Sequence, residues 1–152
     1  MLEPTTSACR AASQLGRTVN LALEDAQLSP AGYRLLAYLS SGPAAATVLA
    51  DKLAVSRPSV TATIDSLEER GQVTRSPDPV DGRRVSVQIT TSGAAALAEA
   101  DGLVAARLRM VLEPAGDAEG ARILKALDGL YELLHVHRTR RHEQRAREAA
   151  GS

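Results

Sequence analysis

One stretch restricts the possible folds more than any other: SRPSVTATIDSLEERG, which spans residues 56–71. Ser56 is a residue type that caps helices, proline is tolerated in a first helical turn, and Gly71 is typical of the position just beyond a helix. Apolar residues recur at helical spacing on one face: Val60, Ile64 and Leu67. The opposite face is polar or small, at Arg57, Ser59, Thr61 and Ala62. The stretch is therefore predicted to be a helix with one buried face and one open face.

Two shorter helices are predicted just before this one. Ser29-Pro30 favours a helix start, and that helix should run to about Leu39, where residues 40–43 (SSGP) end it. Residues 44–53 are predicted to form the next helix, followed by a turn at Ala54-Val55. The helix at residues 44–53, the tight turn after it and the polar, exposed helix at residues 56–71 together are typical of a helix-turn-helix.

A hairpin is predicted directly after the helix-turn-helix. Its strands are residues 72–76 and 85–89, and Asp81-Gly82 favours the turn between them. Apolar residues alternate with polar ones along the second strand, so one side should face inward: Val85, Val87 and Ile89. A hairpin in this place is a wing.

Helices at both ends of the chain carry more apolar surface than one small winged unit can cover. They are predicted from Ser7 to Ala26, from a cap at Thr90 to about residue 113, and onward from Asp117. Gly102 should weaken or bend the second of these, and the tail from residue 135 should fray. The simplest use for the surplus apolar surface is a shared homodimer core.

The predicted fold class is mainly α with a small β wing: a winged helix-turn-helix plus a helical dimerisation lobe. We expect a single domain over residues 1–152. The winged lobe should cover about residues 29–90, and the dimerisation lobe about residues 5–27 and 91–145.

The charge balance gives no general attraction to nucleic acid, because the formal net charge is zero. Over residues 55–90, the arginines at 57, 70, 75, 83 and 84 are matched by acids at 65, 68, 69, 78 and 81. Any DNA binding must therefore depend on where the cations lie. The acids of the predicted helix come late in it, away from its N-terminal turn, where the positive end of the helix suits phosphate.

Other classes of function find little support in the residues. Cys9 is the only cysteine, so no intrachain disulfide can form, and we expect an inert, partly buried thiol in a reducing cytoplasm. No signal-peptide pattern or membrane-length apolar run is present, so no membrane partner is expected. No phosphate loop or nucleophile with a matching base indicates an enzyme. No metal site or cofactor is predicted, since the histidines lack the spacing of a closed site.

The order of helices, the stretch at residues 56–71 and above all DPVDGRRVSVQITTSG resemble the MarR family of bacterial transcriptional regulators, over roughly residues 8–134. The resemblance implies a homodimer that binds a pseudo-palindromic double-stranded DNA. The recognition helix, Arg57 to Arg70, would enter the major groove. Arg83 would enter the minor groove, held by Asp81, and Arg84 would contact a phosphate.

Eight residues are predicted to form the DNA-binding site: Ser56, Arg57, Ser59, Thr61, Arg75, Asp81, Arg83 and Arg84. For Ser56 a plain helix cap is an equal alternative, and for Arg75 a cross-strand salt bridge is one. Three positions depart from the family pattern: Gly32 replaces a capping Gln or Glu, Ala54 a turn glycine, and Ala62 a long polar side chain. The last leaves Arg57, Ser59 and Thr61 as the main base readers.

The resemblance also implies a pocket for a small anionic or phenolic effector between the two lobes. Arg17, Tyr33 and Arg34 are the candidates, although surface or dimer contacts are favoured for each. The predicted function is a sequence-specific DNA-binding regulator, a repressor that acts as a homodimer and is relieved by such an effector if one exists. The alternative is a winged-helix dimer that serves as a protein-interaction module without DNA binding.

Overall fold

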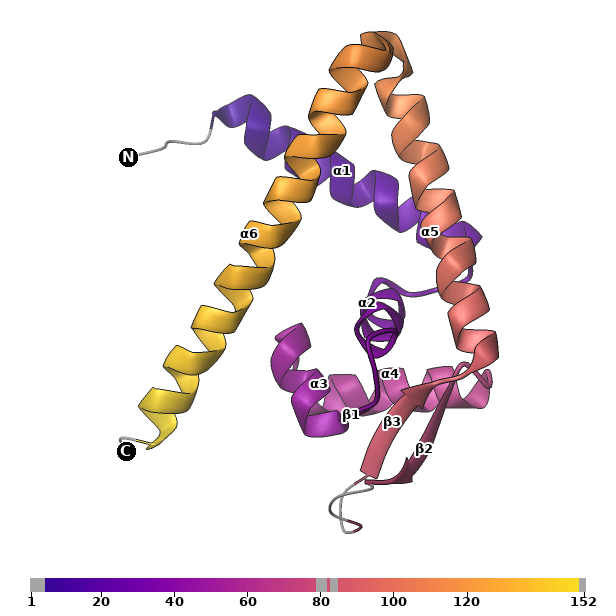
Figure 1. The fold of residues 1–152 in the computed structure, drawn as a ribbon, viewed down its shortest axis with the longest axis vertical. Coiled ribbons are helices and arrows are strands. Elements are labelled where there is room, and N and C mark those ends of the chain that lie inside the picture. Colours follow the sequence, from indigo (N-terminus) through magenta and orange to yellow (C-terminus); the bar gives the residue numbers. More distant parts are fainter. Residues whose placement is uncertain (1–4, 79–81, 83–84, 151–152) are drawn as a thin grey trace.

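The computed structural model describes the backbone of residues 5–78, 82 and 85–150, and the side chains of these residues up to 134 and at 137. Helices dominate, and one small antiparallel sheet lies at one end of the molecule (Figure 1). The predicted fold class, mainly α with a small β wing, is confirmed. The elements follow in the order α1 (Thr6–Asp25), α2 (Pro30–Leu39), β1 (Ala44–Ala45), α3 (Ala46–Leu53), α4 (Arg57–Glu69), β2 (Val73–Pro77), β3 (Val85–Ile89), α5 (Thr91–Leu112), η1 (Glu113–Ala115) and α6 (Gly116–Ala150).

Side-chain caps start the helices where the sequence indicates. Ser29 accepts a hydrogen bond from the backbone N–H of Gly32 at 3.0 Å, and Thr90 accepts one from Gly93 at 3.0 Å. Each bond satisfies a backbone donor that has no partner within its helix. Ala54, where the family pattern has glycine, takes a left-handed φ of 55° at the end of α3. That backbone conformation explains the family's glycine, because glycine adopts it without steric cost.

The sheet has the strand order β1-β3-β2 and shows one error in the sequence prediction. Residues 44–53 were expected to be a single helix, but Ala44 and Ala45 pair with Val87 and Ser86 of β3, and α3 begins only at Ala46. Pairing with a distant strand satisfies the backbone of these two alanines, which outweighs their high helix propensity. β2 pairs along the other edge of β3, from Val73 opposite Ile89 to Pro77 opposite Val85.

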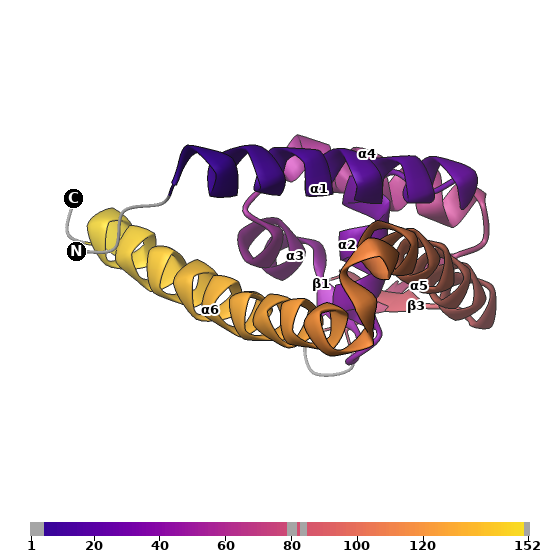
Figure 2. The ribbon, with the colours of Figure 1, turned by 90° about the horizontal axis from the view of Figure 1, so that it is seen from above.

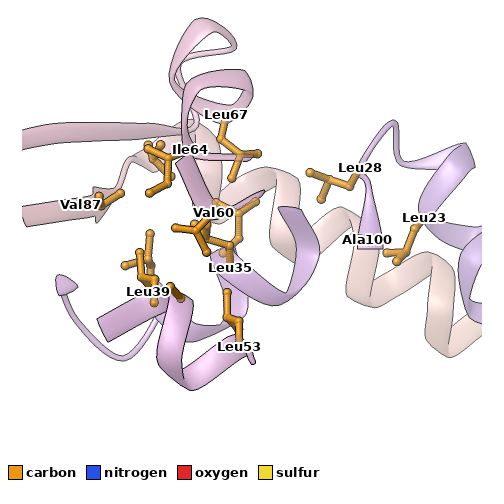
Figure 3. Close-up of a cluster of buried hydrophobic side chains, with 14 residues drawn as sticks. Leu23, Leu28, Leu35, Leu39, Leu53, Val60, Ile64, Leu67, Val87 and Ala100 are labelled. Atoms are coloured by element: carbon orange, nitrogen blue, oxygen red, sulfur yellow. The ribbon is translucent and has the colours of Figure 1, made fainter. Parts of the chain in front are cut away.

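The core fills the space between α2, α3, α4 and the sheet, as Figure 3 shows. Leucines dominate it, and Leu35, Leu36 and Leu49 are completely buried. β3 contributes Val87, whereas Val85, expected on the same inward side, is 50% exposed. Val85 lies at the end of the wing farthest from α5, where no helix covers it. Leu23 of α1 and Ala100 of α5 extend the same cluster into the helical lobe.

The helical lobe combines both ends of the chain. α1 packs along α5, and the chain then reverses at η1 so that α6 runs back past α3 on one side of the molecule (Figures 1 and 2). The helix continues to Ala150 and so includes the tail from residue 135. Among the described residues, no helix is long and apolar enough to cross a membrane.

Large apolar side chains are exposed along α5 and α6 of the single protomer. The exposed fractions range from 36% at Ile123 to 72% at Met110. The other members are Val111, Leu124, Leu130, Tyr131, Leu133 and Leu134. So large an apolar surface is unusual for a monomer in water.

Candidate nucleic-acid-binding surface

The two faces of α4 divide as its sequence predicts. Val60, Ile64 and Leu67 are at most 3% exposed and pack into the core. The residues on the other face are exposed: Arg57, Ser59, Thr61 and Ala62. The N-terminal half of this open face carries short side chains and one arginine, whereas the C-terminal half is also exposed and carries the acids Asp65 and Glu69.

Hydroxyl groups on this face bond to the helix itself. The Ser56 Oγ accepts from the Ser59 N–H at 3.3 Å and lies 2.8 Å from the Ser59 Oγ. The Thr61 Oγ1 donates to the carbonyl oxygen of Arg57 at 3.0 Å. Ser56 is thus the helix cap that the sequence allowed, and the Thr61 hydroxyl, with its proton engaged, remains an acceptor. Both side chains keep their oxygens at the surface of the helix.

Arg57 is the cation of the first turn of α4. It is exposed, and its guanidinium has no hydrogen-bond or ion-pair partner within the described part of the chain. The backbone N–H groups of the same turn give this end of the helix a partial positive charge. A free guanidinium next to a helix N-terminus can bind a phosphate or the edge of a guanine.

The wing lies beside α4 and is held by a compact junction. Gly71 has a φ of 68°, and the chain turns there from α4 into β2. The Thr90 Oγ1 donates to the carbonyl oxygen of Gly71 at 2.7 Å, and the Thr90 N–H donates to that of Gln72 at 3.1 Å. The start of β2 is therefore tied to the start of α5. The predicted wing-tip residues Asp81, Arg83 and Arg84 lie outside the described residues.

Arg75 of β2 is held by two carboxylates of α4. Its guanidinium donates to Asp65 and to Glu68, and its backbone N–H donates to the Glu68 Oε1 at 3.2 Å. Burial lowers the pKa of this guanidinium, but the hydrogen bonds and charges of Asp65 and Glu68 outweigh that effect and raise the pKa overall. The salt bridge joins strand to helix and does not cross the sheet, because Arg75 is opposite Val87 in β3.

The three predicted effector residues make different contacts. Tyr33 donates a hydrogen bond to the Asp101 carboxylate of α5 at 2.5 Å, and Arg34 bonds back to the Pro30 carbonyl oxygen at 3.4 Å. Arg17 is exposed on α1, with no hydrogen-bond or ion-pair partner among the described residues. Burial first, and then the Asp101 carboxylate, raises the pKa of Tyr33 above its usual range. Of the three, only Arg34 lines the shallow hollow between α2, α3 and α4.

Cys9 differs from the expectation of a partly buried thiol, because it is exposed on α1. The N-terminal half of α1 extends beyond the part of α1 that contributes to the core, so nothing in the single protomer covers it. Across the described residues, no three His, Cys, Asp or Glu side chains gather as metal ligands would.

Comparison with known proteins agrees with this geometry. A family model described as MarR family matches residues 26–84. A Thauera aromatica protein, described as a transcriptional regulatory protein for the hcr operon, is 29% identical over 105 residues. That match covers 68% of this chain and 63% of the relative, so this chain spans less than two thirds of the relative's length.

Two solved structures show the same fold along most of their length. The apo form of wild-type MarR from E. coli is 24% identical, with a TM-score of 0.70 over 86% of this chain and 98% of that one. The transcriptional repressor CouR, bound to a 23-mer DNA duplex, is 29% identical, with a TM-score of 0.67 over 84% of this chain and 92% of that one.

Proposed function

We propose that this chain, whose residues 26–84 match the MarR family model, is a MarR-family repressor that binds a pseudo-palindromic operator as a homodimer. The observation that carries the proposal is the open N-terminal half of α4, which presents the exposed guanidinium of Arg57 and the side-chain oxygens of Ser59 and Thr61. The likeness to CouR, solved on a DNA duplex, supports it. Such a protein would act in the cytoplasm, where bacterial DNA lies.

In this proposal α4 is the recognition helix and enters the major groove. Arg57 donates to a guanine edge or a phosphate, and Ser59 and Thr61 contact phosphate or base edges. Ala62 adds no polar group, so the base contacts fall on these three residues. Through the family resemblance, Arg83 enters the neighbouring minor groove and Arg84 contacts a phosphate.

The exposed apolar group on α5 and α6 is proposed to form the centre of the homodimer. Covering it with a second copy removes the side chains of Met110, Val111 and Leu133 from water, which favours association. A two-fold dimer presents two copies of α4 to one side of a duplex. Their half-sites should lie about 34–36 Å apart, one helical turn of DNA.

An anionic effector is not part of this proposal. The Tyr33 hydroxyl is bonded to the Asp101 carboxylate, which would repel an anion placed there. Arg17 and Arg34 are instead proposed as surface or dimer-contact residues.

Selection of bound duplexes from a random pool tests the function. The wild-type protein should enrich a pseudo-palindrome, and its binding should weaken steeply with salt because phosphate contacts release counterions. Arg57→Ala should cost about 1–3 kcal/mol of operator affinity at fixed salt, as for a specific base or phosphate contact. Arg122→Ala is the matched control, because Arg122 is an exposed arginine on α6, paired with Glu119 and remote from α4.

Two results would contradict the proposal. If a dimeric wild-type protein enriches no sequence even at low salt, the protein-interaction alternative holds instead. If Arg57→Ala and Arg122→Ala bind the selected operator equally well, α4 is not the reading element. For the wing, unchanged operator affinity of Arg83→Ala at fixed salt would refute the minor-groove contact.

A further inference from the structure

Arg75 points toward α4 rather than outward from the wing. Side chains alternate between the two faces of a strand, so Arg75 shares a face with Val73 and not with Thr74 or Ser76. Val73 is 2% exposed and belongs to the core, whereas Thr74 and Ser76 are exposed. The strand therefore directs Arg75 inward, and its side chain is only 30% exposed.

The partners of Arg75 form a matching site on α4. Asp65 and Glu68 are three residues apart, so they lie on the same side of the helix one turn from each other. The planar guanidinium donates to both carboxylates at once, and Glu68 also accepts the backbone N–H of Arg75. These three residues, named here the Arg75 cluster, fix both the side chain and the backbone of β2 against α4.

We infer that Arg75 is a positioning residue that sets the angle of the wing relative to the recognition helix, and that it does not contact DNA. The inference deepens the proposed function and rests on it where DNA binding is concerned. Its contacts with Asp65 and Glu68 carry it, since a phosphate contact would require Arg75 to leave both carboxylates unneutralised close to the DNA backbone.

The Arg75 cluster lies where it can support the outer part of the wing. The junction at Gly71 and Thr90 holds only the base of the hairpin. A two-stranded hairpin is marginally stable by itself, so its outer part needs support from a neighbour. β1 supports one edge by pairing with Val87 and Ser86, and the Arg75 cluster supports the opposite edge at the level of Val87. A rigid, bidentate contact at this level limits the pivoting of the wing about its base.

Two substitutions on α4 distinguish a positioning role of Arg75 from a general effect of charge on DNA binding. Glu68→Ala and Glu69→Ala each remove one negative charge from adjacent positions of α4, but only Glu68 contacts Arg75. If charge alone matters, both variants should bind the operator more tightly. If the Arg75 cluster positions the wing, Glu68→Ala should bind about three- to tenfold more weakly, because fewer molecules have a binding-competent wing, while Glu69→Ala should not lose affinity.

The salt dependence of binding gives a second, independent measure. Arg75→Met keeps most of the side-chain bulk and removes the charge. It should weaken operator binding about three- to tenfold without changing the slope of log K against log salt concentration. A residue that neutralises a phosphate would instead reduce that slope by about one. A reduced slope in Arg75→Met, together with tighter binding by Glu68→Ala, would overturn the inference.

Amide hydrogen exchange of the DNA-free protein separates failure of this inference from failure of the proposed function. In Arg75→Met, the amides of β2 and β3 should exchange faster than in the wild type, while those of α2 stay unchanged. If the wild-type protein selects no DNA, the proposed function fails, and the exchange result alone decides the role of the cluster. Unchanged exchange in β2 and β3 would refute the positioning role whatever the DNA result.

Discussion

Replacing Gly93 by alanine should destabilise this protein although the change adds only one methyl group. Gly93 lies in the first turn of α5, where a Cβ would stand 1.9 Å from the carbonyl oxygen of Gln72 and 2.9 Å from the Cγ1 of Ile89. The nearest obstacle is a backbone atom, which cannot rotate away as a flexible side chain could. Cβ atoms essentially never approach other atoms within 3.0 Å, so the two segments would have to separate by about 1.1 Å.

The cost follows from what that separation breaks. Overpacking of this kind costs about 1–3 kcal/mol, and we expect the upper part of that range because backbone must move. The Gln72 carbonyl oxygen accepts the Thr90 N–H at 3.1 Å, and losing that bond adds about 1 kcal/mol. The higher helix propensity of alanine offsets about 1 kcal/mol of this loss in the free energy of unfolding. The net loss should be about 2–3 kcal/mol, which lowers the melting temperature by about 4–12 °C.

Urea unfolding followed by circular dichroism measures this difference. All variants should be compared at one protein concentration, because dimerisation would make the transition depend on concentration. Gly102→Ala is the matched control, since it is the same substitution in the same helix and no atom lies within 4 Å of the new Cβ. It should raise the free energy of unfolding by up to about 1 kcal/mol. If Gly93→Ala is as stable as the wild type, the close approach of α5 to Gln72 is wrong.

Three further outcomes are expected. Ser29→Ala should lower the free energy of unfolding by about 1 kcal/mol in urea titrations, because it removes the cap bonded to Gly32. The raised pKa of Tyr33 means that the folded state keeps its proton when the unfolded state loses it above about pH 10, so stability should fall as pH rises past that value. Tyr33→Phe should show a smaller fall in parallel unfolding curves; equal falls would contradict the Asp101 contact. Leu133→Asp should convert the proposed dimer into a folded monomer by light scattering, and an unchanged mass would place the interface elsewhere.

Much of the local structure could be predicted because it depends on residues that are close in the chain. The capping hydroxyls of Ser29, Ser56 and Thr90 and the apolar spacing of α4 each act within a few residues. The buried face of α4 and the exposure of Arg57 follow directly from that spacing. Where prediction failed, as at Ala44 and Ala45, a strand more than forty residues later outweighed a local preference for helix.

The candidate site was predictable in part for the same reason. Which face of α4 is open is a property of that helix alone. The partners of Arg75 could not be deduced from the sequence. An arginine on a strand can pair with an acid across the sheet or with an acid on a neighbouring helix, and the sequence does not give the angle between β2 and α4. The Tyr33–Asp101 bond likewise joins residues 68 positions apart, so no spacing rule could have indicated it.

The sequence by itself therefore determined the elements, their apolar faces and the family to which the winged part is related, since capping, periodicity and turn chemistry are local. Only the tertiary structure decided how the wing is held. It placed Arg75 between Asp65 and Glu68 and brought Gly93 against the backbone of Gln72. Those contacts depend on the packing of α4, β2 and α5 in three dimensions, which fixes distances and directions between segments that the order of residues leaves open.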